Sequence, residues 1–202
     1  MFDFGNPIRP PEPGARADAL AEFGLDPARR TLLAFGGSQG ARALNEALAA
    51  ALAGGAFADV NVLWGTGTSH VAAYERYARA GRIAVRGFFD PMAAAYRAAD
   101  LVVCRAGAMT TAELCAWGKP SVLVPLPSAA ADHQTHNART LAATGAAILL
   151  PEHDVTADGL GRLIADLLAD PDRLASLSTA ARARGRPESA QRIVSKILTL
   201  AP

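Results

Sequence analysis

Short runs of apolar residues alternate along the chain with longer stretches rich in Ala, Leu, Glu and Arg, such as residues 41–53, 69–80 and 108–117. The longer stretches have the pattern of helices. Continuous apolar strands with helices between them are typical of a parallel sheet that is covered on both faces. We therefore predict one doubly wound α/β domain. Its strands are expected at residues 31–35, 60–65, 83–88, 100–104, 121–125 and 146–150.

The two ends of the chain differ from this alternating pattern. The C-terminal third predicts three helices, at residues 155–168, 171–184 and 188–200, separated by Asp170-Pro171 and Gly185-Arg186-Pro187. The first 13 residues are rich in Pro and Gly and indicate a linker or an extended lead-in. We therefore expect a lead-in over residues 1–13 and a single domain over residues 14–202.

Composition narrows the class of protein without identifying it. Half of the 202 residues are hydrophobic and the formal net charge is +1, as in ordinary globular proteins. A basic excess, which would favour nucleic acid, is lacking, and so is an apolar run long enough to span a membrane. Residues 1–7 do not have the pattern of a secretory signal. Cys104 and Cys115 lack metal-ligand spacing, so we expect a cytoplasmic protein without disulfides or a metal.

A glycine-rich turn follows the first predicted strand. Its sequence is Gly36-Gly37-Ser38-Gln39-Gly40-Ala41, and a predicted helix comes next. Glycines let backbone amides approach an anion, and a helix N-terminus favours negative charge. The turn is neither a Walker A loop nor a GxGxxG fingerprint, because the lysine and the third glycine are absent. A tight turn that simply needs small residues explains it equally well.

A second turn of this kind, Arg105-Ala106-Gly107-Ala108, follows the fourth predicted strand. Free amides at the start of the next helix would suit a diphosphate, and Glu113 could accept hydrogen bonds from ribose hydroxyls. Thr110 and Glu113 also have the spacing of a capping box, in which Glu113 only satisfies the helix start. On this spacing alone the cap is the preferred interpretation.

Polar and aromatic residues follow two further strands. Asp132 is a candidate N-cap for a helix that carries His133 and His136. These histidines have the spacing of metal ligands but lack a third, so an exposed helix start is the simpler interpretation of His136. Phe88 and Phe89 close the third strand, where an aromatic ring can flank a nucleobase, although core packing is the default for Phe88. Core contacts are likewise expected for Cys104, Trp64 and Trp117.

Taken together and in order, these motifs resemble one family. They are Gly5-Asn6-Pro7-Ile8-Arg9, then Gly36–Ala41, then Gly87-Phe88-Phe89-Asp90 with Met92, then Cys104-Arg105-Ala106-Gly107-Ala108-Met109-Thr110, and finally His133-Gln134-Thr135-His136-Asn137-Ala138. The set is similar to the C-terminal domain of the MurG family, bacterial UDP-N-acetylglucosamine:lipid I N-acetylglucosaminyltransferases of GT-B architecture. The resemblance runs from about Gly5 to the C-terminus.

The resemblance implies a Rossmann-like domain that binds the donor, UDP-GlcNAc, without a cofactor. Arg9 and Ser38 would contact the nucleotide sugar, the backbone of Phe89 would meet the uracil, and Glu113 would bind the ribose. Main-chain groups of Ala108, Met109 and Thr110 would cradle phosphate and sugar, beside Thr111 and Ala112. Gln134 would bind the GlcNAc hydroxyls. Further candidates are Gly37, Gln39, Phe88 and His133, although His133 stands where some members have Gln, which leaves its role open.

The family's other half carries the acceptor site for lipid I and the proposed general base, so we expect no catalytic residue in this chain. An inverting transfer of GlcNAc would need both halves, at the cytoplasmic face of the inner membrane. The chain alone is expected to bind UDP-GlcNAc weakly without transferring it. The face that meets the other half would be exposed, from which we expect weak self-association.

Three alternatives remain open at this point. The chain could be a truncated transferase or the natural donor subunit of a two-chain transferase. It could instead be a nucleotide-binding or structural module without a transferase role. A UDP-sugar epimerase or hydrolase of related fold would need its own acid or base, for which His133 is the only candidate.

Overall fold

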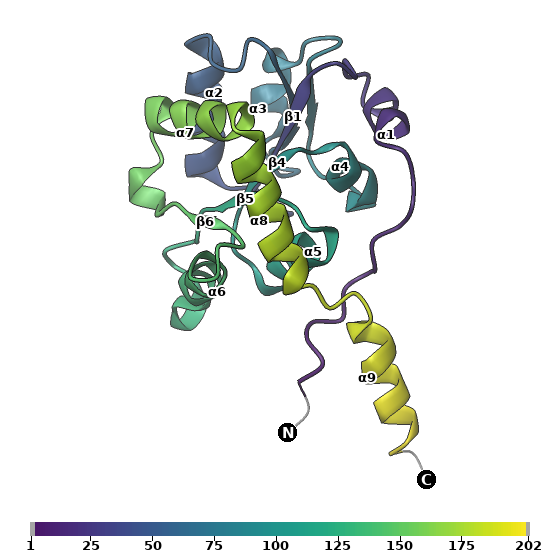
Figure 1. The fold of residues 1–202 in the computed structure, drawn as a ribbon. Helices are drawn as coiled ribbons and strands as arrows, with labels where there is room; N and C mark the ends of the chain where they lie inside the picture. The colour runs from purple at the N-terminus through teal and green to yellow at the C-terminus, as the bar shows by residue number, and fades with distance from the viewer. Residues whose placement is uncertain (1–2, 201–202) are drawn as a thin grey trace.

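The computed structural model describes residues 3–200, so the outermost residues of the predicted lead-in (1–2) and domain (201–202) lie outside the described residues. Within these residues, six parallel strands form one sheet in the order β3-β2-β1-β4-β5-β6. Figure 1 shows the sheet in the interior of the molecule, with helices around it. The doubly wound parallel sheet is therefore confirmed. The strands are β1 Arg30–Phe35, β2 Val60–Gly65, β3 Ile83–Arg86, β4 Leu101–Cys104, β5 Ser121–Leu123 and β6 Ile148–Leu149.

Helices connect successive strands and continue after the last one. The α-helices are α1 Arg16–Glu22, α2 Arg42–Ala53, α3 Val71–Tyr74, α4 Met92–Ala98, α5 Ala108–Trp117, α6 His133–Ala142, α7 Ala157–Ala169, α8 Pro171–Ala183 and α9 Ser189–Leu198. The short 3-10 helices of the described residues are η1 Glu75–Tyr77, η2 Ala130–Asp132 and η3 Glu152–Asp154. The three predicted C-terminal helices are confirmed as α7, α8 and α9, with ends shifted by one or two residues.

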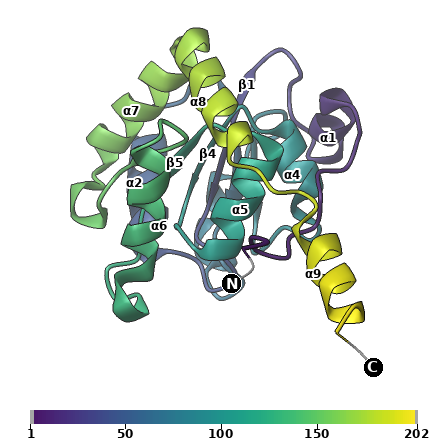
Figure 2. The ribbon, with the colours of Figure 1, turned by 60° about the horizontal axis from the view of Figure 1, so that its bottom comes forward.

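The sheet is buried on both faces, as its continuous apolar strands require. Successive residues of a strand point to opposite faces, so Leu32 packs in one core cluster and Leu33 in the other, and both are fully buried. Figure 2 shows α2 and α7 on one side of the strands and α1 and α4 on the other. Helix α8 joins the two layers, because Leu177 belongs to one cluster and Ala181 to the other.

The predicted helix over residues 69–80 is wrong in its extent. The structure has only one α-helical turn, α3, followed by η1. Two aromatic side chains of this segment, Tyr74 and Tyr77, pack against the buried ring of Trp64 with centroid distances of 4.8 and 5.8 Å. These tertiary contacts on β2 take the place of a regular amphipathic helix.

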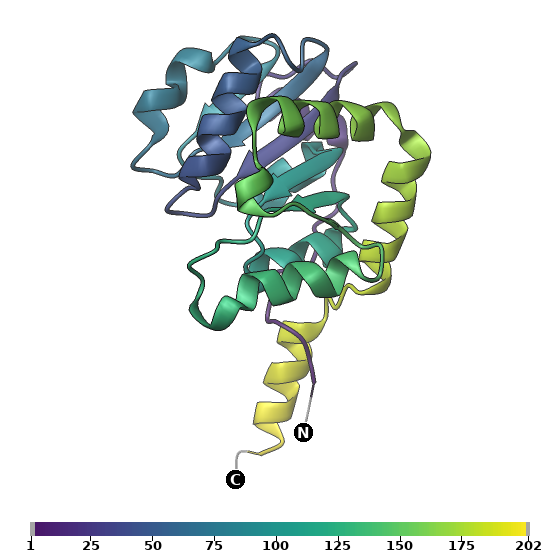
Figure 3. The ribbon, with the colours of Figure 1, turned by 90° about the vertical axis from the view of Figure 1, so that its left-hand side faces the viewer.

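The first described residues of the lead-in lie near the start of α9, below the body of the sheet (Figures 1 and 3). The Ser189 hydroxyl donates to the Phe4 carbonyl oxygen at 2.6 Å, and Arg186 forms an ion pair with Asp3 at 2.7 Å. Ile8 is buried, so the lead-in packs on the domain at this point. The Asn6 side-chain amide donates to the Ala108 carbonyl oxygen at 3.0 Å. This hydrogen bond places the lead-in next to the start of α5.

Candidate functional site

The strand order reverses between β1 and β4, which places a crevice at the carboxyl ends of these two strands. The two glycine turns singled out in the sequence, after β1 and after β4, are the segments that leave the sheet at this point. Ligands of open α/β sheets bind at such a switch point. The fold therefore brings together two candidate motifs that lie about 70 residues apart in the chain.

The turn after β1 is shaped by close packing at two of its glycines. A Cβ on Gly36 would stand 2.2 Å from the Ala41 nitrogen, and a Cβ on Gly40 would stand 2.1 Å from the Thr66 carbonyl oxygen. The tight-turn interpretation is therefore correct for these two positions. Gly37 differs, because its φ of +85° needs glycine while no other atom lies within 4 Å of its Cβ position. Gly37 is thus the glycine of this turn that is open to a ligand.

The turn after β4 leaves the start of α5 uncapped. Its N-cap residue is Gly107, and no side chain accepts a hydrogen bond from the first turn. Thr110 lies inside the helix rather than at the N-cap, so the predicted capping box is wrong. The amides of the first turn are therefore left without a side-chain partner, which is the arrangement that binds anions at helix N-termini.

Glu113 is held by a neighbouring helix and not by the start of its own. The Tyr96 hydroxyl on α4 donates to Glu113 Oε2 at 2.9 Å. The Glu113 side chain is half-buried, whereas Tyr96 is 1% exposed. Burial, followed by the negative charge of Glu113, raises the pKa of Tyr96, so that the phenol keeps its proton and remains a donor.

Two cavities adjoin Glu113. The larger, of about 330 Å³, lies between the lead-in, the loop after β3 and α5, and it is lined by Arg9, Phe88, Met109 and Trp117 among others. The smaller, of about 160 Å³, reaches the carboxyl ends of β1 and β2 and is lined by Gly37 and Thr110 among others. Both cavities share Phe88, Phe89, Met92, Tyr96 and Glu113.

The two phenylalanines after β3 have opposite environments. Phe89 is buried and packs edge-on against Phe23, with a centroid distance of 5.6 Å. Phe88 is 48% exposed, so core packing as its default interpretation is wrong. An exposed aromatic ring that lines both cavities is available to a ligand, whereas Phe89 can offer mainly its backbone.

Gln134 ties together the loops that follow β4 and β5. Its Oε1 accepts hydrogen bonds from the amides of Ala106 and Leu126, at 3.2 and 3.0 Å. The Asn137 side-chain amide donates to the Ala106 carbonyl oxygen at 2.9 Å. Two side chains of α6 therefore bind the backbone of Ala106, one at its amide and the other at its carbonyl oxygen. Only the Nε2 amide of Gln134 is left to donate to a ligand.

The remaining candidates are spread around these cavities. Ser38, Gln39 and Ala108 are exposed, and they line neither cavity. Thr111 and Ala112 lie on another face of α5, where they line a separate cavity of about 440 Å³.

At the start of α6, His133 is exposed, with Nδ1 at 2.7 Å from the Ala130 carbonyl oxygen, and His136 is exposed as expected. Asp132 precedes α6 in a left-handed conformation and its side chain does not cap the helix, so the predicted cap is wrong.

Three contributors to the site received no role from the sequence. The sequence around Tyr96 does not indicate a functional role, because a tyrosine among alanines has the pattern of a core residue. Asn137 and Arg105 stood inside the motifs. Arg105 donates to the carbonyl oxygens of Val124 and Pro125, at 3.3 and 3.1 Å, and forms an ion pair with Glu152. It thus joins the ends of β4 and β5 to η3.

Core contacts are confirmed for Cys104 and Trp64, which are fully buried, and half-buried Trp117 packs against the core. Both cysteines are free.

Among residues 3–200, no group of three or more His, Cys, Asp and Glu side chains has an arrangement that could hold a metal ion. The same residues contain no helix that is long and apolar enough to cross a membrane.

A parallel sheet of this order, with cavities and an uncapped helix at its switch point, defines a Rossmann-like domain. Residues 31–193 match the family described as the glycosyltransferase family 28 C-terminal domain. The chain belongs to this family, which confirms the resemblance seen in the motifs.

Curated relatives and solved structures agree with this assignment. The chain is 44% identical to the UDP-N-acetylglucosamine--N-acetylmuramyl-(pentapeptide) pyrophosphoryl-undecaprenol N-acetylglucosamine transferase of Nitratidesulfovibrio vulgaris (strain DP4), over 97% of this chain and 54% of the relative. The enzyme of the same name from Xanthomonas axonopodis pv. citri (strain 306) is 47% identical, over 96% and 46%. The chain thus spans about half the length of the curated relatives it matches.

A crystal structure of Acinetobacter baumannii MurG superimposes with a TM-score of 0.76 and 35% identity, over 93% of this chain and 54% of that one. A UDP-N-acetylglucosamine 2-epimerase shares the fold, with a TM-score of 0.57 and 18% identity. The fold is therefore that of one half of a GT-B glycosyltransferase.

Proposed function

We propose that this chain is the donor-binding half of an inverting glycosyltransferase that transfers GlcNAc from UDP-GlcNAc to lipid I in peptidoglycan synthesis. The observation that carries the proposal is the carboxylate of Glu113, which adjoins two cavities beside the uncapped start of α5. The names of the relatives supply the sugar and the acceptor.

The geometry supports a particular placement of the nucleotide. Glu113 accepts hydrogen bonds from the ribose hydroxyls, as acidic residues do in other Rossmann-like sites. The diphosphate lies at the N-terminus of α5, where free amides and the helix dipole favour negative charge. The uracil lies in the larger cavity, beside exposed Phe88 and the backbone of Phe89, with Arg9 at its edge.

In the transfer step, a hydroxyl of the acceptor attacks the anomeric carbon of GlcNAc and the bond to the UDP oxygen breaks, with inversion. The leaving UDP gains negative charge, which the amides at the start of α5 stabilise. The attacking hydroxyl must lose a proton to a general base. We place that base, with the acceptor site, in the half of the relatives that this chain does not span. The transfer would take place at the cytoplasmic face of the inner membrane.

Calorimetric titration of the chain with UDP-GlcNAc, UDP, UDP-glucose and ADP tests the proposal. We expect binding of the uridine compounds and none of ADP, and no transfer to a lipid I analogue. Folded protein that binds none of these ligands would support a structural module instead. Transfer by the chain alone would contradict the assignment of the general base to the other half.

Gln134 allows a test of sugar recognition. The variant Gln134→Glu keeps an acceptor for the amides of Ala106 and Leu126 but loses the donor that we assign to the GlcNAc hydroxyls. The added negative charge lies near the proposed diphosphate site and weakens both ligands, so we expect the loss for UDP-GlcNAc to exceed the loss for UDP by about tenfold, as for one hydrogen bond of about 1.4 kcal/mol. Gln134→Ala should in addition lower the melting temperature. An equal loss for both ligands in Gln134→Glu would contradict a contact with the sugar.

We also propose that residues 14–202 form the donor domain and that its exposed C-terminal helix promotes weak self-association when the other half is absent. Val194, Ile197, Leu198 and Leu200 are 55 to 71% exposed. Sedimentation velocity should show dimers that increase with concentration. Leu198→Glu should abolish them, whereas Gln191→Glu on the same helix should not. A monomer at every concentration would contradict this proposal.

A further inference from the structure

We propose that Tyr96 is a positioning residue, which fixes the Glu113 carboxylate in the orientation that receives the ribose. The inference rests on the proposed function, because it assigns Glu113 to the ribose. It adds a residue on a different helix, α4, whose hydroxyl acts on the ribose through Glu113.

The position of the Tyr96 hydroxyl is set by packing. The ring lies between other aromatic side chains, with centroid distances of 6.4 Å to Phe35 and 5.8 Å to Trp117. It is 1% exposed, so its neighbours enclose it almost completely. The hydroxyl donates to Glu113 Oε2 at 2.9 Å, so a rigid donor meets the carboxylate.

Glu113 needs such a restraint more than a shorter side chain would. A glutamate has several rotatable bonds, and ordering them on ligand binding costs conformational entropy. Within residues 3–200, the Glu113 side chain has Tyr96 as its single hydrogen-bond partner and forms no ion pair. Oε1 is therefore left for the ligand. The bond orders the carboxylate before the nucleotide arrives, which raises affinity through preorganisation.

A purely structural role of Tyr96 would have a different signature. Tyr96 also lines both cavities. Loss of packing there would weaken every uridine ligand to the same extent. Loss of the hydroxyl alone should matter only for ligands that have ribose hydroxyls for Glu113 to bind.

The test compares UDP with 2′,3′-dideoxyuridine diphosphate in calorimetry on the full chain. Tyr96→Phe keeps the ring and removes the hydroxyl. We expect a loss of about tenfold for UDP, equivalent to about 1.4 kcal/mol, and unchanged affinity for the dideoxy compound. Tyr74→Phe, a half-buried tyrosine that packs on Trp64, is the matched control and should change neither affinity.

A double-mutant comparison completes the design. In a Glu113→Ala background, Tyr96→Phe should have no further effect on UDP, because the two residues act as one unit. Equal losses for both ligands, or an undiminished effect in that background, would overturn the role of Tyr96. If the wild-type chain binds neither ligand, the proposed function fails. If Glu113→Ala abolishes the preference for UDP while Tyr96→Phe leaves it intact, only the inference on Tyr96 fails.

Discussion

Replacing Glu113 by alanine is expected to weaken UDP binding by about 100-fold. The carboxylate would accept hydrogen bonds from ribose hydroxyls, and two bonds to a charged group together contribute about 3 kcal/mol. The same change leaves the buried Tyr96 hydroxyl without its acceptor, which should cost about 1 to 3 kcal/mol of unfolding free energy. Calorimetry and chemical denaturation measure the two effects separately.

Glu113→Gln is the control that separates binding from folding. Its amide oxygen can still accept the hydrogen bond from Tyr96, so we expect a stability within about 0.5 kcal/mol of the wild type. Its affinity for UDP should still fall about tenfold, because a neutral amide is the weaker acceptor. If Glu113→Ala loses stability but retains full UDP affinity, Glu113 is only a structural residue.

The second large effect is expected at Arg9. Its guanidinium is exposed at the larger cavity beside Glu113, and no hydrogen bond or ion pair holds it within residues 3–200. Arg9→Ala should therefore leave the melting temperature unchanged. It should weaken UDP binding by about tenfold or more, because a charge-assisted hydrogen bond contributes about 1.5 to 3 kcal/mol.

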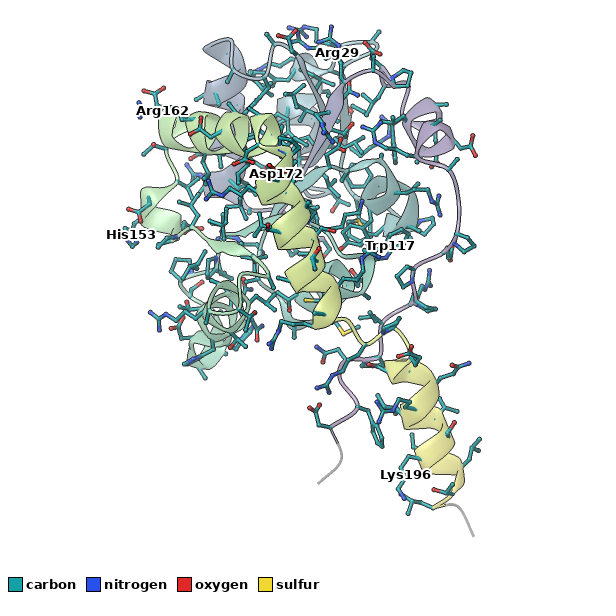
Figure 4. The ribbon with its side chains drawn as sticks, in the orientation of Figure 1. Arg29, Trp117, His153, Arg162, Asp172 and Lys196 are labelled. Atoms are coloured by element: carbon teal, nitrogen blue, oxygen red, sulfur yellow. The ribbon has the colours of Figure 1, made fainter. Side chains whose placement is uncertain are left out.

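Arg162→Ala is the matched control for this prediction. Arg162 is an exposed arginine on α7, on another side of the molecule from Trp117, which lines the larger cavity (Figure 4). Its replacement should change neither stability nor affinity. The loss in Arg9→Ala should also shrink in high salt, which screens exposed charges. An equal loss in both variants would show a general effect of net charge instead of a contact.

The strands could be predicted because burial on both faces leaves a continuous apolar run, and all six runs contain a strand. The predicted strands run one or two residues past the carboxyl ends of β3, β5 and β6, because the apolar pattern continues beyond each strand. After β3, these residues are Gly87 and Phe88, which line the smaller cavity. Helices α1 and α4 were missed, since helices of seven residues give a weak periodic signal.

The site was predictable as a set of segments but not as contacts. The spacing of Thr110 and Glu113 fits a capping box, and only the fold shows Tyr96 of α4 at the carboxylate. In the same way, Gly36 and Gly37 are neighbours in sequence, yet a Cβ on Gly36 would clash within the turn, whereas Gly37 needs glycine for its positive φ and faces open space. Such distinctions depend on atoms that are distant in the chain, which local patterns do not contain.

A crystal structure of the chain with UDP tests the central claim most directly. The account predicts ribose hydroxyls within about 2.6 to 3.0 Å of Glu113, the diphosphate against the first-turn amides of α5, and the uracil beside Phe88. UDP bound elsewhere, for instance in the cavity lined by Thr111 and Ala112, would contradict it.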